Sequence, residues 1–378
     1  MSELNKINQL VENLNLPQPL VIGLEGGPCG GKTTIIDTLK NITNLQIEIL
    51  PEVASEKISQ LNDMGRSVVD MACNNRSEYR SFQSGILAEI VSRVVNAKIK
   101  YEGTNQIIIS DRVDIGAYVE SDEYNSVLNE LGYSVAPYLA LIDKVIYLPT
   151  LAKINPAKYR LLAKDNPARY EDSIEQAVST CNRNLLSIAD HPELSIYWAG
   201  EIVDKTEKIQ QEISEPEREL EAKFVSDGFY KKEEIQHFLK NRCSLFLSRI
   251  AIKQSYHRLN SLEYRLRQIT NERGEYIYYY SLKTGKYDER REMRRIIDQD
   301  SYQLLSKAEV IGELTKERYR YLFDIIPGSD KCTILAADFY NESGHCVLEV
   351  ENFNPNAAKD IFLPGFEPSD VSARDLIV

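Results

Sequence analysis

Residues 20–39 read LVIGLEGGPCGGKTTIIDTL and decide the fold of the amino-terminal half of the chain. An apolar, strand-like run ends in glycines, and residues 32–39 then look helical. Residues 26–33, GGPCGGKT, match the phosphate-loop pattern GxxxxGK[ST], in which backbone N–H groups approach phosphate oxygens at a helix N-terminus. The predicted phosphate-binding residues of this loop are Gly26, Gly27, Gly30, Gly31, Lys32, Thr33 and Thr34.

Two of these residues have side chains with expected contacts. Lys32 is expected to reach the β- and γ-phosphates of ATP or GTP, and Thr33 to ligate Mg²⁺. An acidic residue is expected at the end of a second apolar strand, and IIISD at 107–111 supplies Asp111. Asp111 is therefore predicted to hold magnesium through water.

Other charged residues near this edge allow two interpretations each. Glu52 directly follows the strand-like run QIEIL, so it is expected at the carboxyl edge of the sheet, where α/β proteins bind ligands. It accepts a proton from an acceptor hydroxyl there, or it is a solvated turn residue or helix cap. Arg160, Lys164 and Arg169 form a lid over the triphosphate, or they lie on a solvated face.

The first 200 residues alternate between strand-like and helical patterns. Strand-like runs lie at 46–50, 106–110, 144–148 and 194–198, with helical patterns at 78–100 and 171–188. This alternation predicts an α/β domain with a parallel sheet covered by helices on both faces. The charged stretch 201–218 is either a solvated helix and linker or a last packed helix. We expect three segments, a nucleotide-binding domain at 1–205, a linker at 206–216 and a second domain at 217–378.

The second domain follows a period of two, which is typical of strands. Like-charged residues recur at i and i+2, mostly opposite apolar or aromatic residues. They form the sets Glu219, Glu221 and Lys223; Arg265 and Arg267; Lys316, Arg318 and Arg320; and Glu349 and Glu351. Either they are the solvent faces of an open sheet, or they converge inside a closed or nearly closed antiparallel sheet. Acidic and basic strands together then suit a metal-bound polyphosphate.

Composition limits the class of protein. The chain has 378 residues, of which 43% are hydrophobic and 27% charged, as in folded globular proteins. The net charge of −12 disfavours general nucleic-acid binding. The six cysteines form no CxxC pair, which favours a reducing cytoplasm over a zinc site or a disulfide framework. No apolar run is long enough to predict a membrane span, and the amino-terminal residues lack the apolar core of a signal peptide. We therefore expect a cytoplasmic protein. The oligomeric state stays open.

The first domain resembles the P-loop kinase-like ATPases related to nicotinamide riboside kinases and nucleoside kinases. The resemblance covers about residues 20–200 and rests on EGGPCGGKTT, LPEVA, the pair Phe82-Gln83 and SDRVDIGAY. It implies that Glu52, Asp111 and Arg112 serve catalysis or acceptor binding.

The second domain resembles the CYTH superfamily, the triphosphate tunnel metalloenzymes, whose ExExK signature matches Glu219-x-Glu221-x-Lys223. The resemblance covers about residues 217–352. Its later elements are Arg265 and Arg267, Lys283, Arg290, the strand from Lys316 to Arg320, Asp338, and Glu349 with Glu351. It implies an eight-stranded antiparallel β-barrel tunnel. The chain departs from the family in carrying Arg294 and Arg295 where members often have an acidic residue.

The CYTH resemblance also implies residue roles. The implied ligands of Mg²⁺ or Mn²⁺ are Glu219, Glu221, Glu349 and Glu351, and the implied catalytic residues are Glu219, Glu221, Lys223 and Glu351. The implied triphosphate-binding residues are Arg265, Arg267, Lys283, Arg290, Lys316, Arg318 and Arg320. The family contains triphosphatases and class IV adenylyl cyclases. Three hypotheses follow: a triphosphate hydrolase joined to an ATP- or GTP-binding domain, a cyclase, and a nucleotide-switched adaptor that holds a phosphoinositide-like ligand without turnover.

Overall fold

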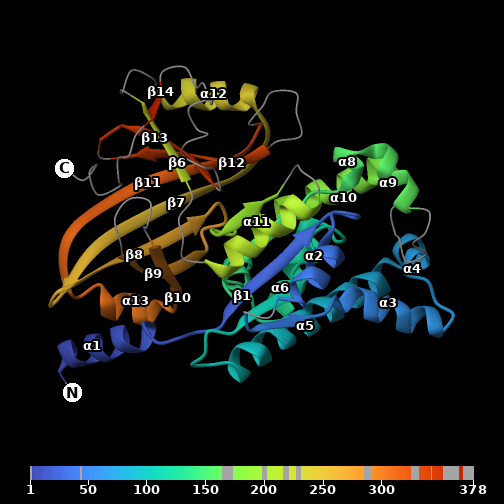
Figure 1. The fold of residues 1–378 in the computed structure, drawn as a ribbon, viewed down its shortest axis with the longest axis horizontal. Coiled ribbons are helices and arrows are strands. Elements are labelled where there is room, and N and C mark those ends of the chain that lie inside the picture. Colours follow the sequence, from blue (N-terminus) through green and yellow to red (C-terminus); the bar gives the residue numbers. More distant parts are fainter. Residues whose placement is uncertain are drawn as a thin grey trace. The chain divides into compact units, whose positions relative to one another are not determined.

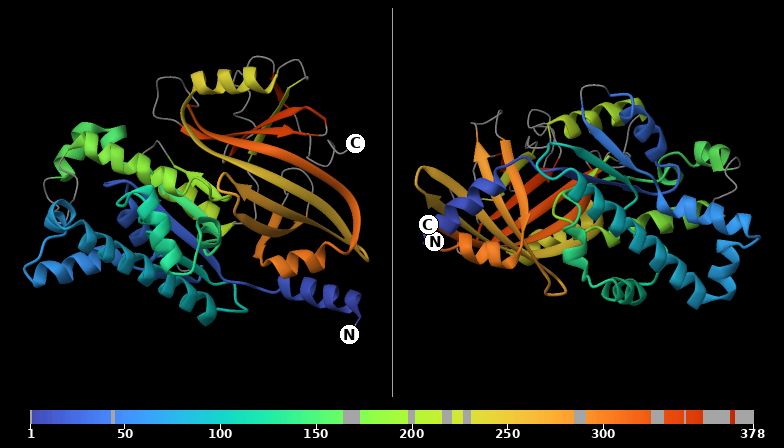
Figure 2. Two further views of the ribbon diagram at one scale, coloured as in Figure 1. Left: turned by 180° about the vertical axis from the view of Figure 1, so that it is seen from behind. Right: turned by 90° about the horizontal axis from the view of Figure 1, so that it is seen from below.

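A computed structural model describes most of the chain in two compact units. The described residues are 2–42, 45–163, 173–197, 202–215, 221–226, 231–284, 291–324, 332–341, 343–351 and 366–368. One unit is Pro17–Gln211, and the other combines Met1–Leu16 with Glu212–Val378. The first is rich in helices and the second is dominated by long strands (Figure 1 and Figure 2).

The unit Pro17–Gln211 contains the predicted parallel sheet. Its strands are β1 (Leu20–Gly26), β2 (Ile47–Leu50), β3 (Ile107–Asp111), β4 (Lys144–Leu148) and β5 (Leu194–Ile196). They lie in the order β2-β3-β1-β4-β5, and all neighbouring pairs are parallel. After β1 the chain first builds the β3 side of the sheet and then the β4 side. The carboxyl end of β1 is therefore a topological switch point, where open α/β sheets bind ligands.

Helices flank this sheet (Figure 1). They are α2 (Lys32–Leu39), α3 (Val53–Asp63), α4 (Val68–Asn74), α5 (Arg76–Lys100), α6 (Ser121–Glu130), α7 (Val135–Leu139), α8 (Leu151–Ile154), α9 (Pro156–Ala163), α10 (Ile174–Ser187) and α11 (Ile202–Ser214). Helix α10 shows how the sequence sets a helix. The Ser173 side chain caps its first turn by accepting from the Gln176 N–H, and Ala177, Cys181 and Leu185 form the buried stripe at intervals of four.

The second unit is built on an antiparallel sheet. Its strands are β6 (Glu221–Ser226), β7 (Cys243–Leu259), β8 (Leu262–Asn271), β9 (Tyr276–Thr284), β10 (Arg291–Ile297), β11 (Glu309–Asp324), β12 (Cys332–Tyr340), β13 (Cys346–Glu351) and β14 (Phe366–Pro368). Their order is β10-β9-β8-β7-β11-β12-β13-β6-β14. The strands β6 to β13 correspond to the predicted eight, and the three-residue strand β14 adds an edge.

The sheet is strongly curved at its two longest strands, β7 and β11 (Figure 1). Their antiparallel pairing shifts register between Val310 and Gly312, between Arg320 and Tyr321, and between Leu322 and Phe323. Such irregularities bend a strand and increase its twist. The curvature brings side chains from strands far apart in the order to the same inner face. In the described part of the chain, β10 and β14 are the two ends of the sheet.

Apolar side chains cover the outer face of this sheet. One cluster packs Leu348 and Phe224 against Ile235 and Leu239 of α12 (Lys232–Arg242). A second cluster is covered by α1 (Glu3–Leu14) and α13 (Gln299–Leu305) and contains Leu266. Successive side chains of a strand point to opposite faces of the sheet, so the charged residues that alternate with these apolar residues lie on the inner face.

The unit boundaries differ from the expected 1–205, 206–216 and 217–378. Residues Ile7 and Val11 of α1 are buried against the antiparallel sheet, so the chain enters that unit first and returns to it after Gln211. The expected linker lies largely within α11, where Ile209 and Ile213 are buried. The charge pattern could not predict that α1 packs on the antiparallel sheet or that the expected linker is part of α11. The sequence of a short amphipathic helix does not indicate which sheet it packs on.

We predict that Ile7→Ala destabilises the antiparallel unit by about 2–4 kcal/mol, the cost of a cavity at a buried isoleucine. Differential scanning calorimetry of the full chain is expected to show this unit's transition moving to lower temperature, with that of Pro17–Gln211 unchanged. Leu4→Ala is the control, since Leu4 lies on the same helix and is 54% exposed. A shift confined to the Pro17–Gln211 transition contradicts the assignment of α1.

Candidate functional site

The phosphate loop has the backbone conformation that its glycines require. Gly26 and Gly31 have φ of +148° and +99°. A Cβ on Gly26 would lie 2.0 Å from the Leu148 carbonyl oxygen, and one on Gly31 would lie 2.4 Å from the Ile202 side chain. The N-cap residue of α2 is Gly31, which has no side chain to cap the helix. Its first N–H groups are therefore available to an anion.

Lys32 lies over this loop, where a bound phosphate chain is expected. Its Nζ donates to the Gly26 carbonyl oxygen at 3.2 Å. Thr33 and Thr34, in the first turn of α2, are exposed. The Thr150 hydroxyl donates to the Pro28 carbonyl oxygen at 2.6 Å and braces the loop from β4, a contact that the sequence did not predict.

Beside the loop, the structure brings Glu52 and Arg112 together. Arg112 Nε donates to Glu52 Oε1 at 2.7 Å, and Arg112 Nη1 donates to the Tyr118 hydroxyl at 2.6 Å. Glu52 occupies the N-cap position of α3, but its side chain does not cap the helix. Burial opposes ionisation of Glu52, yet the cations Arg112 and Lys32 outweigh it, and the pKa of this carboxyl is lowered. Glu52 is therefore an ionised group of the site.

Asp111 ends β3 next to these residues. Burial raises its pKa, with Lys32 acting in the opposite direction. Its Oδ1 atom is buried and has no hydrogen-bond partner among the described residues. A buried carboxylate oxygen without a donor suits a cation or its bound water, so Asp111 and the exposed Thr33 fit a magnesium ion at the loop. No cluster of three or more potential His, Cys, Asp or Glu ligands occurs in the described parts of the chain.

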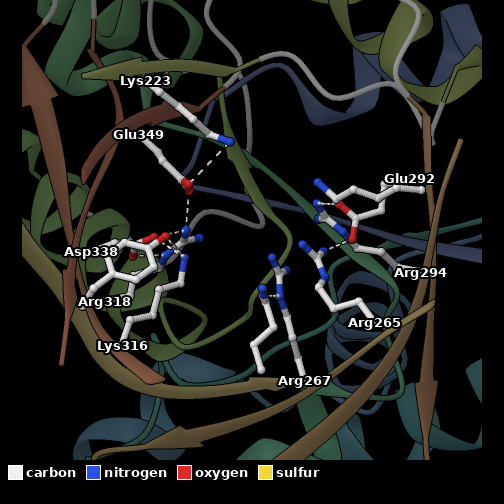
Figure 3. A network of polar contacts seen from close by, with 12 residues as sticks. Lys223, Arg265, Arg267, Glu292, Arg294, Lys316, Arg318, Asp338 and Glu349 are labelled. Carbon is white, nitrogen blue, oxygen red and sulfur yellow. Dashed lines mark hydrogen bonds and ion pairs between the residues drawn. The ribbon is translucent and has the colours of Figure 1, made fainter. Parts of the chain in front are cut away.

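The second candidate site is the inner face of the antiparallel sheet, here called the charged face. Its described charged residues are Lys223, Arg265, Arg267, Lys283, Glu292, Arg294, Lys316, Arg318, Arg320, Asp338 and Glu349. Figure 3 shows nine of them pointing into one space from strands on opposite sides. Cations clearly outnumber carboxylates.

One part of the charged face centres on Asp338 and Glu349. Arg318 Nε and Nη2 donate to the two Asp338 oxygens at 2.6 and 2.7 Å, and Lys316 pairs with the same carboxylate. Arg318 also pairs with Glu349, which has Lys223 at 3.9 Å. Burial alone would raise the pKa of Glu349, but Arg318, Lys316 and Lys223 hold it well below its usual range.

The other part centres on Glu292, which sequence reasoning missed. This buried carboxylate pairs with Arg265, with Lys283 at 3.3 Å and with Arg294 at 2.8 Å. The period of two places Glu292 and Arg294 on the charged face, so the strand that carries Arg294 also brings an acidic residue to this face. Arg295 pairs in register with Tyr280, whose side chain belongs to the outer cluster.

Arg267 lies between the two parts and donates to Gln254 at 2.7 Å. Burial lowers its pKa, and so do the neighbouring cations Arg294 and Arg318. Burial likewise lowers the pKa of Lys316 to about 8, although Asp338 opposes the change. Both shifts show cations that repel one another in a site of low polarity. An anion placed among them removes that repulsion.

Several predicted residues cannot be placed. The predicted residues outside the described part of the chain are Lys164, Arg169, Glu219 and Arg290. Glu221 and Glu351 are paired in register between β6 and β13, but only their backbone is described. The expected metal site of four glutamates therefore stays a prediction. The buried Arg320 extends the series of Lys316 and Arg318 along β11.

Comparison with known proteins gives one partial family match. A family model described as an AAA domain matches residues 21–193, which include the phosphate loop and Asp111. The amino-terminal unit is thus a P-loop-like domain similar to AAA domains, and the finer likeness to nucleoside kinases stays a prediction. A search of curated proteins gives no match. No described helix has the length and apolar character of a membrane span.

Among solved structures, "The crystal structure of the inorganic triphosphatase NE1496" aligns with 23% identity and a TM-score of 0.26, over 40% of this chain and 87% of that chain. A second structure, of "the hypothetical protein NE1496", has the same values. A chain of the Schizosaccharomyces pombe Mediator head module aligns with 13% identity and a TM-score of 0.27, over 38% of this chain and 89% of that chain. At these TM-scores the likenesses carry no argument about fold or function.

The lowered pKa of Lys316 predicts a pH dependence of stability. Between pH 8 and about 10.5 the folded chain has lost this proton while the unfolded chain retains it, so the free energy of unfolding rises with pH across that window. Relative to Lys316→Met, which cannot titrate there, we expect the wild type to gain roughly 2–3 kcal/mol. Urea unfolding at pH 7, 8, 9 and 10 measures this difference, and parallel pH curves contradict it.

Proposed function

We propose that the antiparallel unit is a metal-dependent triphosphate hydrolase and that the P-loop-like unit binds ATP or GTP with Mg²⁺. The observation that carries the proposal is the excess of cations over carboxylates among the described residues of the charged face, eight against three, with Arg265, Lys316 and Arg320 buried. Lys316 and Arg320 are almost completely buried, where a charge is costly unless opposite charge lies close to it. A linear triphosphate supplies several negative charges along one chain and suits a row of such cations.

The two parts of the charged face support a ligand of this length. The Glu292 part lies on β8 to β10, and the Glu349 part lies on β6 and β11 to β13. Arg267 on β8 has Arg294 and Arg318 as neighbours, so it links them. A single phosphate neutralises one of these parts, whereas a polyphosphate chain contacts both. Inorganic tripolyphosphate and nucleoside or other organic triphosphates are the substrate class.

The metal would be held by Glu219, Glu221, Glu349 and Glu351. The register pairing of Glu221 with Glu351 is consistent with this set. Hard divalent cations such as Mg²⁺ and Mn²⁺ prefer carboxylate oxygens. Bound there, the ion supplies an activated water and polarises the phosphoryl group. The residues Arg318 and Arg267 orient the triphosphate and neutralise its charge.

Product analysis separates the three hypotheses. The purified chain is incubated with Mg²⁺ or Mn²⁺ and with tripolyphosphate, ATP or GTP. Orthophosphate release supports hydrolysis, whereas pyrophosphate with a cyclic nucleotide supports the cyclase. Tight binding without any product supports the adaptor and contradicts the proposed activity.

We predict that Lys32→Ala removes high-affinity nucleotide binding at the phosphate loop and leaves tripolyphosphate hydrolysis within about twofold of the wild type. Each site has its own lysines, so loss of nucleotide binding at the phosphate loop is not expected to affect hydrolysis at the charged face. Lys40→Ala is the control, because Lys40 is exposed and directly follows the last residue of the same helix. Titration calorimetry and phosphate release measure the two functions. Loss of tripolyphosphate hydrolysis in a folded Lys32→Ala protein contradicts separate sites.

We predict that Glu219→Gln combined with Glu351→Gln lowers metal-dependent tripolyphosphate hydrolysis by at least about 100-fold, because two ligand charges are removed while shape is kept. Circular dichroism is expected to show an unchanged fold. Glu309→Gln, at an exposed position of β11, is the control and is expected to retain activity. Wild-type activity in the folded double variant contradicts the assignment of these glutamates as metal ligands.

A further inference from the structure

We propose that Glu25 is a positioning residue that holds the corner carrying Asp111 and Arg112 in place against the phosphate loop. This inference rests on the proposed nucleotide binding at that loop and goes beyond it. Glu25 is the penultimate residue of β1, directly before Gly26, and has no exposed surface. Nothing in the loop pattern GxxxxGK[ST] requires a carboxylate at this position, since the pattern begins at the next residue.

The Glu25 carboxylate is fully engaged by donors from three segments. Its Oε1 accepts from the backbone N–H groups of Val113 and Asp114 at 2.6 and 2.8 Å. Its Oε2 accepts from Asn184 Nδ2 at 3.1 Å and from the Gly26 N–H at 3.3 Å. One side chain therefore connects the start of the phosphate loop, the segment after β3 and helix α10.

The segment after β3 needs such an anchor because it turns sharply at Arg112. Arg112 has φ of +70°, a left-handed conformation that is unfavourable for a residue with a side chain. Its N–H donates to the Leu24 carbonyl oxygen at 3.1 Å. Together with the two bonds to Glu25, three successive N–H groups after Asp111 are bound by the last residues of β1.

The far side of the same corner is fixed by a second buried carboxylate. Asp114 accepts from the Tyr124 hydroxyl at 2.5 Å and from the Gly116 N–H at 2.8 Å, and Ser187 also donates to it. Asp114 thus secures the corner to α6 and α10, whereas Glu25 secures it to the phosphate loop. The distance between the loop and the Asp111 and Arg112 side chains depends on Glu25.

Glu25 could instead act through its charge, and two substitutions separate the possibilities. Glu25→Gln keeps the reach and leaves one carbonyl oxygen to accept from Val113 and Asp114. The Asn184 amide can then turn to offer its Oδ1, which has no partner among the described residues, to the new NH₂ group. Glu25→Asp keeps the charge but is one methylene too short to hold both N–H groups.

The experiment compares both variants in the full chain with Mg²⁺ and ATP or GTP as ligands. Every protein, the wild-type reference included, carries Glu219→Gln and Glu351→Gln, which remove the hydrolysis proposed for the antiparallel unit. For Glu25→Asp, we expect kcat of nucleotide hydrolysis to fall by about 100-fold with KM nearly unchanged, because the loop still binds phosphate while the corner moves. For Glu25→Gln, we expect kcat within about threefold of the wild type. The exposed Glu102, changed to Asp and to Gln, is the control. The opposite order, with Gln inactive and Asp active, overturns the proposal in favour of a charge effect.

Hydrogen exchange provides a readout that does not depend on turnover. Peptides covering 111–116 are expected to lose amide protection in Glu25→Asp and to keep it in Glu25→Gln. Retained protection in Glu25→Asp overturns the proposal. If the wild type neither binds nor hydrolyses nucleotide, the proposed function of this unit fails, and the exchange result still decides whether Glu25 holds the corner.

Discussion

The charged face of the antiparallel sheet depends on one constraint, which is that buried like charges require compensation. Glu292 and Asp338 each pair with more than one cation, and Arg267 is flanked by two others. Removing such groups from water costs several kcal/mol per ion unless opposite charge replaces the water. The carboxylates of the charged face supply part of this opposite charge. A sheet that turns its charged residues to the inner face and its apolar residues to the outer face is therefore suited to an anion.

The phosphate loop is suited to an anion mainly through its backbone rather than through charged side chains. Its donors are backbone N–H groups of the loop and of the start of α2, together with Lys32, whose Nζ donates to the Gly26 carbonyl oxygen. Such a site needs little side-chain charge, but it needs a fixed backbone. The glycines permit the path, since a Cβ at Gly26 meets the Leu148 carbonyl. Buried hydrogen bonds from Thr150 and Glu25 then hold the path and its neighbours.

The sequence predicted the features that a local pattern determines, namely the phosphate loop and the residues that share one face of a strand. The loop GGPCGGKT sets its own conformation, and a period of two assigns Arg265, Arg318 and Glu349 to one face without knowledge of the neighbours. It could not predict contacts made by distant segments. Helix α1 packs on strands more than 240 residues later in the chain, as Ile7 and Leu259 show. Glu25 is useful only because the turn at Arg112 lies beside it, and that turn depends on strand order rather than on any motif.

The two sites therefore differ in what protonation can change. Backbone N–H groups do not titrate in the range where proteins are folded, so their hydrogen bonds to a bound phosphate do not change with pH. On the charged face the lowered pKa of Lys316, about 8, makes one of the gripping charges conditional on pH near neutrality. A bound anion favours the protonated form and raises that pKa again. Ligand and proton then bind together on the charged face, because the described cations there outnumber the described carboxylates.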